Sequence, residues 1–193
     1  MRKSIFFFAL LTIHLFACQE QNPVVSIETE LGTLQVELYE KEAPITVANF
    51  LKYVKSGKLN TGEFYRVVTM ENQPNNDIKI EVIQGGLGWS DDIVRYDSIP
   101  IETTEMTGIK HLDGVISMAR STPGSASSEF FICVGDQPEL DFGGLRNLDG
   151  YGFAAFGKVV SGMDVVLRIQ NSPSEQQFLQ PTIKINTAAI VGQ

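Results

Sequence analysis

The chain has 193 residues, of which 43% are hydrophobic and 20% charged, with a formal net charge of -8. This length fits one ordinary domain, and the composition is that of a globular protein rather than a disordered one. An acidic chain without a cluster of Lys and Arg lacks the basic surface that phosphate contacts need, so the composition argues against a nucleic-acid partner.

The first residues predict a targeting segment. Arg2 and Lys3 precede an apolar stretch that ends in LFAC at Cys18. The stretch is as long as the core of a signal peptide and short for a membrane span. LFAC resembles a bacterial lipobox, so residues 1–17 are predicted to be a lipoprotein signal peptide, with Cys18 acylated and residues 18–23 a tether. The alternative is an ordinary secretory signal with an incidental Cys. We expect a lipid-anchored protein of the bacterial cell envelope, facing the periplasm or the exterior.

Short strands dominate the rest of the chain. Alternating apolar residues predict strands, and the apolar stripe of APITVANFLKYVKSG at i, i+3, i+4 and i+7 predicts an amphipathic helix. Residues 70–77 are polar and are predicted to form a loop. The predicted strands are 24–28, 33–38, 64–68, 78–83, 114–118, 130–134, 154–160 and 183–191, and the predicted helices are 44–57 and 163–170. About eight short strands with two helices indicate a mainly β barrel or sandwich, and closure would remove the exposed sheet edges.

The sequence lacks the residues that common hydrolases and metal sites need. If Cys18 carries lipid, Cys133 is left without a disulfide partner, and its apolar strand indicates a buried, unreactive thiol. His111 is the only histidine that remains after signal removal. No G-x-S-x-G elbow is present, and a His/Cys zinc site lacks ligands. We therefore expect neither a metal nor a cofactor.

Five motifs occur in a characteristic order: ELYEKEAPITVANFLKYVKSG, FYRVV, IQGG, GVISMARSTPGSASSEFFICVG and FAAFGKVVSGMDVV. Together they resemble the cyclophilins, a family of peptidyl-prolyl cis–trans isomerases, over residues 24 to 192, and the bacterial secreted branch most of all. The resemblance implies a closed eight-stranded antiparallel β-barrel capped by two α-helices in a single domain, 24–193. It also implies a monomer that isomerises X–Pro bonds during the folding of envelope or secreted proteins. Its partners would be unfolded or flexible Pro-containing polypeptides.

The chemistry of this reaction needs a fixed cation rather than a nucleophile. Twisting an X–Pro amide crosses a barrier of about 20 kcal/mol and makes the prolyl nitrogen a better hydrogen-bond acceptor. A positioned cation would favour the twisted state over the planar one. Arg66, in FYRVV, matches the catalytic arginine of the family. Gln84, in IQGG, matches the glutamine that contacts substrate and supports that arginine.

The same resemblance assigns the substrate groove. The segment ARSTPGSASS would line a channel for an extended peptide, with small side chains leaving room for it. Residues at the remaining matched positions would contact the proline or its neighbours. These substrate-binding candidates are Val82, Ala119, Arg120, Glu129, Phe131, Leu140 and Phe153. Ala119 and Arg120 would touch the residue before proline, and Phe131 would form the floor of the proline pocket. Without the resemblance, Phe131 and Phe153 would be assigned to the barrel core, as aromatic residues in strands usually are.

Several residues depart from the family pattern. Val82 and Glu81 stand where Met and Phe are usual, which would remove an aromatic wall from the pocket. Glu129 replaces a usual Gln, and we expect its carboxylate near Arg66, either orienting or partly neutralising it. Glu139 stands where animal members carry Trp, which predicts weak cyclosporin binding. Residues 69–79 resemble an insertion beside the site.

These departures keep two other functions open. One is a catalytically weak cyclophilin-like module that binds Pro-containing peptides as a chaperone or scaffold, and the other is a structural envelope lipoprotein without a peptide site. The acidic net charge predicts a preference against acidic peptides.

Overall fold

The computed structural model describes residues 21–90 and 92–192. The predicted signal peptide and the acylated Cys18 therefore lie outside the described residues. No helix in the described part is long and apolar enough to cross a membrane.

The chain forms short strands with few helices. The strands are β1 (Val24–Thr29), β2 (Gly32–Leu38), β3 (Glu63–Val68), β4 (Val82–Gly86), β5 (Val115–Met118), β6 (Phe130–Cys133), β7 (Ala154–Ser161), β8 (Ser174–Glu175) and β9 (Phe178–Ile190). The α-helices are α1 (Pro44–Lys55), α2 (Thr104–Thr107) and α3 (Met163–Gln170), with 3₁₀ turns η1 (Lys58–Thr61) and η2 (Pro138–Leu140). The two predicted helices are confirmed as α1 and α3, and α2 is an additional single turn.

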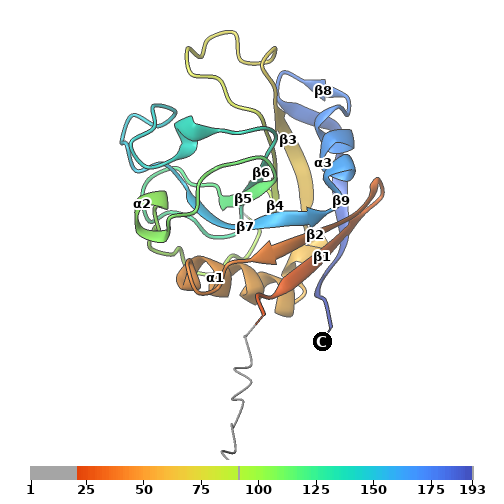
Figure 1. Ribbon diagram of the computed structural model, residues 1–193. Helices are drawn as coiled ribbons and strands as arrows, with labels where there is room; N and C mark the ends of the chain where they lie inside the picture. The colour runs from red at the N-terminus through yellow and green to blue at the C-terminus, as the bar shows by residue number, and fades with distance from the viewer. Residues whose placement is uncertain (1–20, 91, 193) are drawn as a thin grey trace, which may run out of the picture.

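The strands close into a barrel (Figure 1). Their order is β1-β2-β7-β5-β6-β4-β3-β9, and a further pairing of β1 with β9 completes the ring. Every pairing is antiparallel, and the two-residue strand β8 extends the sheet only as a hairpin with β9. This confirms the predicted closed eight-stranded antiparallel barrel. Closure gives the strands of the ring a partner on both sides.

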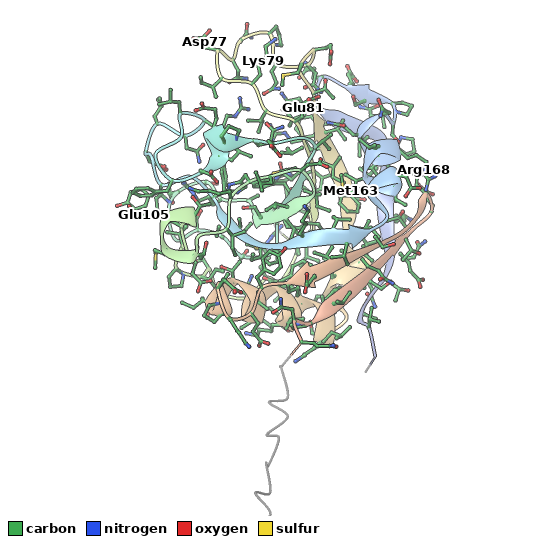
Figure 2. All side chains as sticks on the ribbon, in the orientation of Figure 1. Asp77, Lys79, Glu81, Glu105, Met163 and Arg168 are labelled. Carbon is green, nitrogen blue, oxygen red and sulfur yellow. The ribbon has the colours of Figure 1, made fainter. Side chains whose placement is uncertain are left out.

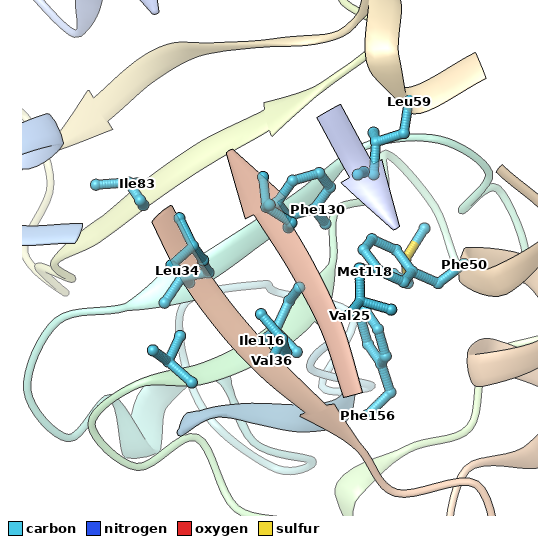
Figure 3. Packing of buried hydrophobic residues seen from close by; sticks show 14 of the residues in the cluster. Val25, Leu34, Val36, Phe50, Leu59, Ile83, Ile116, Met118, Phe130 and Phe156 are labelled. Carbon is cyan, nitrogen blue, oxygen red and sulfur yellow. The ribbon is translucent and has the colours of Figure 1, made fainter. Parts of the chain in front are cut away.

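Side-chain periodicity explains the core. Leu34, Val36 and Leu38 alternate along β2 and are fully buried, as a half-buried strand requires. The stripe on α1 packs onto the barrel, and Pro44 occupies its first turn, where no backbone N–H is needed. Phe130 lies at the centre, with its ring edge-on to Phe50 at 5.6 Å and to Phe64 at 5.7 Å. Figure 3 shows Phe50, Phe130 and Phe156 in this core.

Two predicted strands, 78–83 and 183–191, have the wrong bounds. Strand β9 begins at Phe178, before the predicted start at Ile183. Strand β4 begins only at Val82 and continues through Gly85 and Gly86. The backbone of Ile80 bonds instead to the buried Gln73 side chain, which donates to its carbonyl at 2.7 Å and accepts from its N–H at 3.3 Å. Gly85 can continue the strand because a Cβ there would lie 2.8 Å from the Glu63 carbonyl oxygen, so only glycine fits.

A second, smaller hydrophobic cluster lies apart from the main core. Its buried members come from β3, β4, β6, η2 and the loop before β4, and they are Val68, Ile80, Val82, Phe131, Cys133 and Leu140. Ala119 and Phe153 pack against it and are partly buried. Apolar side chains that gather outside a barrel and remain partly open to solvent indicate a binding surface.

Candidate active site

A cavity of about 460 Å3 opens beside this second cluster. All of the predicted catalytic and substrate-binding side chains line it, namely Arg66, Val82, Gln84, Ala119, Arg120, Glu129, Phe131, Leu140 and Phe153. The fold therefore brings together positions that are spread over much of the sequence. Their individual roles stay predictions.

Strand register places the central three side by side. Arg66 on β3 lies opposite Gln84 on β4, and Gln84 lies opposite Phe131 on β6. The Arg66 guanidinium donates from Nη1 to Gln84 Oε1 at 2.8 Å. It also donates from Nε and Nη2 to Gln177 Oε1, at 3.0 and 2.5 Å. Two amide oxygens on opposite sides thus hold the guanidinium in one orientation without neutralising it.

Gln177 was not predicted from the sequence. It lies in the turn between β8 and β9, and its Nε2 donates to the Asn72 carbonyl at 3.1 Å. No local pattern around SEQQF marks this glutamine, because its partner Arg66 is 111 residues away in the chain.

Aromatic and aliphatic side chains form the apolar end of the cavity. Phe131 and Phe153 meet edge to face, with ring centroids 5.2 Å apart. Leu140, Val82 and Ile80 complete the wall. Ile80 was not among the predicted residues, and it supplies bulk where the sequence suggested that an aromatic wall was missing. Glu81, by contrast, does not line the cavity, and in Figure 2 it lies at the foot of the loop that carries Asp77 and Lys79.

Arg120 is held at the rim of the cavity. Its guanidinium pairs with both Asp149 carboxylate oxygens, at 2.7 and 2.9 Å, and its Nε donates to the Gly152 carbonyl at 2.8 Å. The same group lies over the Phe153 ring at 5.2 Å. Ser121, Ser125 and Ser127 follow along the channel. These small residues keep the wall low, so an extended chain has room beside the aromatic pocket.

Glu129 lines the same cavity as Arg66, as expected, but makes no ion pair with it. Its carboxylate accepts from the Tyr65 hydroxyl at 2.7 Å, the Ser128 hydroxyl at 2.8 Å and the Leu87 N–H at 3.1 Å. Burial raises the pKa of Glu129 although these hydrogen bonds act to lower it. The carboxylate is therefore buried among uncharged donors and does not neutralise Arg66 by direct contact.

Tyr65 links this carboxylate to the arginine. Its hydroxyl accepts from Gln84 Nε2 at 2.9 Å while donating to Glu129. Burial, and then the charge of Glu129, raise the pKa of Tyr65, so the hydroxyl stays a donor. A buried chain of hydrogen bonds thus runs from Glu129 through Tyr65 and Gln84 to Arg66. Strand alternation did not predict it, because the register shifts between Phe64 and Arg66.

Ser117, His111 and Asp141 form a hydrogen-bonded trio beneath the pocket, in which Ser117 and His111 are buried and Asp141 is partly exposed. His111 Nδ1 lies 2.8 Å from Asp141 Oδ1, and Nε2 lies 3.0 Å from Ser117 Oγ. These are the residue types of a hydrolase triad, but Ser117 has no exposed surface and does not line the cavity, so no substrate reaches it. The imidazole is stacked on Phe131 with centroids 5.9 Å apart. The trio therefore supports the pocket floor from behind.

The described residues offer no cluster of metal ligands. Within 21–90 and 92–192, no three His, Cys, Asp or Glu side chains gather in a geometry that could hold a metal ion. Cys133 is fully buried, and burial raises the pKa of its thiol. The chemistry visible at the cavity is that of hydrogen bonding, charge and apolar contact.

A closed antiparallel barrel with an arginine beside an aromatic pocket on its outer face defines the cyclophilin class of protein. The family model described as "Cyclophilin type peptidyl-prolyl cis-trans isomerase/CLD" matches residues 24–190. The chain belongs to this family of peptidyl-prolyl cis–trans isomerases, and the predicted family, fold class and enzyme class are confirmed.

Bacterial relatives and solved structures agree. The chain is 37% identical over 183 residues to "Peptidyl-prolyl cis-trans isomerase" of Acinetobacter baylyi, covering 94% of this chain and 88% of that protein. It is 36% identical over 149 residues to "Peptidyl-prolyl cis-trans isomerase B" of Escherichia coli, covering 76% and 84%. A crystal structure of a cyclophilin-type isomerase from Cryptosporidium parvum superposes with a TM-score of 0.67 at 25% identity, covering 89% and 99%. A second crystal structure of that protein was obtained in the presence of the dipeptide Ala-Pro.

Proposed function

We propose that this isomerase acts on X–Pro bonds of unfolded or flexible polypeptides in the cell envelope, with Arg66 as the catalytic cation. One observation carries the proposal: the Arg66 guanidinium is held by Gln84 and Gln177 on the wall of the cavity that Phe131 floors. A cation beside an apolar pocket is what the reaction needs.

The geometry suggests how the barrier is lowered. The apolar end of the cavity, with Phe131, Leu140 and Phe153, grips the proline ring. The flanking chain lies along Ala119 and Arg120. As the amide twists, its nitrogen loses resonance and accepts a hydrogen bond from Arg66. Because this bond forms only in the twisted state, it stabilises the transition state more than either planar isomer.

The arginine's role is tested by isomer exchange in a short X–Pro peptide, followed by two-dimensional NMR on the chain from Pro23. Arg66→Ala should lower the catalysed rate by roughly a hundredfold or more, the scale for loss of one transition-state donor. Arg168→Gln, on the exposed face of α3, is the matched control and should keep full activity (Figure 2).

The alternative of a catalytically weak holding module predicts a different result. Peptide signals would then broaden on binding while exchange stayed slow in the wild-type protein as well as in Arg66→Ala. Circular dichroism of each variant distinguishes a lost donor from a lost fold. Undiminished exchange in a folded Arg66→Ala protein would contradict the mechanism.

We further propose that the protein is a monomer, anchored to a bacterial membrane by lipid on Cys18. The support is the sequence of residues 1–18, together with the position of β1. The chain enters β1 at the bottom of Figure 1, whereas the loop of residues 69–81, which brings Ile80 to the cavity, is at the top. A tether there would leave the groove open to clients.

The anchor is tested by fractionation of cells. The wild-type protein should be found with membranes and incorporate labelled fatty acid, and Cys18→Ser should lose the label. An unlabelled wild-type protein in the soluble fraction would indicate an ordinary secretory signal instead.

A further inference from the structure

The groove carries a charge opposite in sign to that of the whole chain. The chain has a formal net charge of -8, yet Arg66, Arg95, Arg120 and Arg146 line the cavity, with Glu129 as the carboxylate among its lining residues. The net charge of the whole chain therefore says little about the charge that a peptide meets at this surface. What a peptide meets is decided by which of these charges are already compensated.

Within the described residues, three of the arginines have their hydrogen bonds to carbonyl oxygens rather than to carboxylates. Arg95 is one of them: it donates to the Ser90 and Ile93 carbonyls, and its charge acts on Glu129. The other two are Arg66 and Arg146. Arg120 is paired with Asp149. Arg66 bonds to the side-chain amides of Gln84 and Gln177, and Arg146 Nη1 donates to the Ile78 carbonyl at 2.6 Å. In the part of the chain that the structure describes, neither Arg66 nor Arg146 has a carboxylate within ion-pair distance.

These two cations also act on each other. Burial lowers the pKa of Arg66, and the positive charge of Arg146 lowers it further. Burial likewise lowers the pKa of Arg146. Two half-buried guanidinium groups on one cavity without a counter-ion favour binding of an anion, because partial burial strengthens the attraction relative to bulk water.

Arg146 is held in place before any peptide binds. Besides the bond to Ile78, its backbone N–H donates to the Glu139 carbonyl at 3.1 Å, and the preceding Leu145 N–H donates to the Glu139 carboxylate at 2.8 Å. Gly144 lets the loop approach this closely, since a Cβ there would lie 2.5 Å from the Glu139 carbonyl oxygen. Glu139 thus serves to fold the Arg146 loop against the cavity, and little side-chain entropy is left to lose on binding.

We propose that the groove selects X–Pro segments with an Asp or Glu side chain next to the proline, and that Arg146 is the residue that determines this preference. The carboxylate would bind Arg146 while the proline ring occupies the pocket beside Arg66. The inference rests on the proposed function and specifies the substrates of the same site.

The test uses peptides with a common Ala-Pro core that carry Glu, Gln or Lys either just before or just after the proline. Catalysed exchange is measured by NMR and divided by the uncatalysed rate of the same peptide. In at least one of the two positions, the wild-type protein should prefer Glu over Gln by roughly three- to tenfold, the range for one partly exposed charge-assisted contact.

Variants of Arg146 assign the preference. Arg146→Gln should bring the Glu/Gln ratio close to one, Arg146→Lys should keep most of it, and Arg146→Glu should shift the preference to the Lys peptide. Arg168→Gln, remote on α3, should leave the ratio unchanged. Added salt should reduce the ratio by screening.

Each failure has a distinct meaning. A wild-type ratio of one at both positions, or a ratio that Arg146→Gln and Arg146→Glu leave unaltered, overturns the selectivity while the Gln peptide still reports isomerase activity. Absence of catalysed exchange with every peptide would instead contradict the proposed function.

Discussion

At the scale of single residues, Glu129 shows how a charge can lie at the site without cancelling the charge of Arg66. Its carboxylate accepts hydrogen bonds from Tyr65, Ser128 and backbone N–H groups, and it reaches the arginine only through Tyr65 and Gln84. Neutral donors satisfy the carboxylate oxygens but do not fully replace the lost hydration, so its pKa is raised.

This shift predicts a pH dependence of stability. The pKa of Glu129 is higher in the folded protein than in the unfolded chain, so the folded form binds this proton more tightly. The stabilisation that Glu129 contributes is fully present below its pKa in the unfolded chain, about 4. It is lost as the pH rises through the pKa of Glu129 in the folded protein. The free energy of unfolding of the wild-type protein minus that of Glu129→Gln should therefore fall with rising pH.

Urea denaturation at a series of pH values measures this difference. Glu40→Gln, in the exposed turn before α1, serves as the matched control. If the free-energy difference between the wild-type protein and Glu129→Gln stays level or grows with pH, the pKa of Glu129 is not raised in the folded protein.

At the scale of elements, the loop of residues 69–81 is a folded unit rather than a loose insertion. The buried Gln73 side chain donates to the carbonyls of Thr69 and Ile80 and so ties its two ends together. The Asn72 side chain accepts a hydrogen bond from the Thr69 N–H. The Asn72 backbone carbonyl accepts one from the side-chain amide of Gln177. Because Gln177 also holds Arg66, the loop supports the site through one intermediate side chain.

Gln73→Ala should therefore cost about 1–3 kcal/mol of unfolding free energy, since it leaves buried backbone groups of Ile80 without partners. Amide hydrogen exchange should quicken between Thr69 and Ile80 while the strands stay protected. Asn75→Ala, at the exposed tip of the same loop, should change neither quantity. Equal protection in the Gln73 variant would mean that other contacts hold the loop.

At the scale of the whole molecule, the barrel depends on pairing between the two ends of the domain. Strand β1 pairs with β9. Strand β9 also pairs with β3, the strand that carries Arg66. Aromatic side chains from different elements fill the core of the barrel. Phe130 of β6 packs against Phe50 of α1 and Phe64 of β3. The position of the site thus follows from closure of the entire sheet.

Phe130→Ala should lower the free energy of unfolding by about 3–5 kcal/mol, the usual cost of a large buried cavity. Thermal and urea unfolding measure the loss. Phe142→Ala, whose ring is 39% exposed, should cost far less. A loss below about 1 kcal/mol for Phe130→Ala would mean that the core collapses around the missing ring.

Sequence alone determined the barrel, the two larger helices and the family. These rest on local signals: alternation along β2, the apolar stripe of α1, and short motifs around Arg66, Gln84 and Phe131. Motif matching also located the side chains that line the cavity, although it could not say how they touch. The sequence left open whether Glu129 orients or partly neutralises Arg66, and the structure shows a link through Tyr65 and Gln84 rather than an ion pair.

Tertiary structure decided which residues orient the arginine. Gln177, Tyr65 and Ile80 reach the site only because the sheet closes and the register shifts after Phe64. The start of β4 depended on Gln73 taking the backbone groups of Ile80, a contact that no periodicity encodes. Patterns along a chain report on a segment's own environment, whereas hydrogen bonds between remote side chains depend on how distant segments are brought together, and only the folded barrel specifies that.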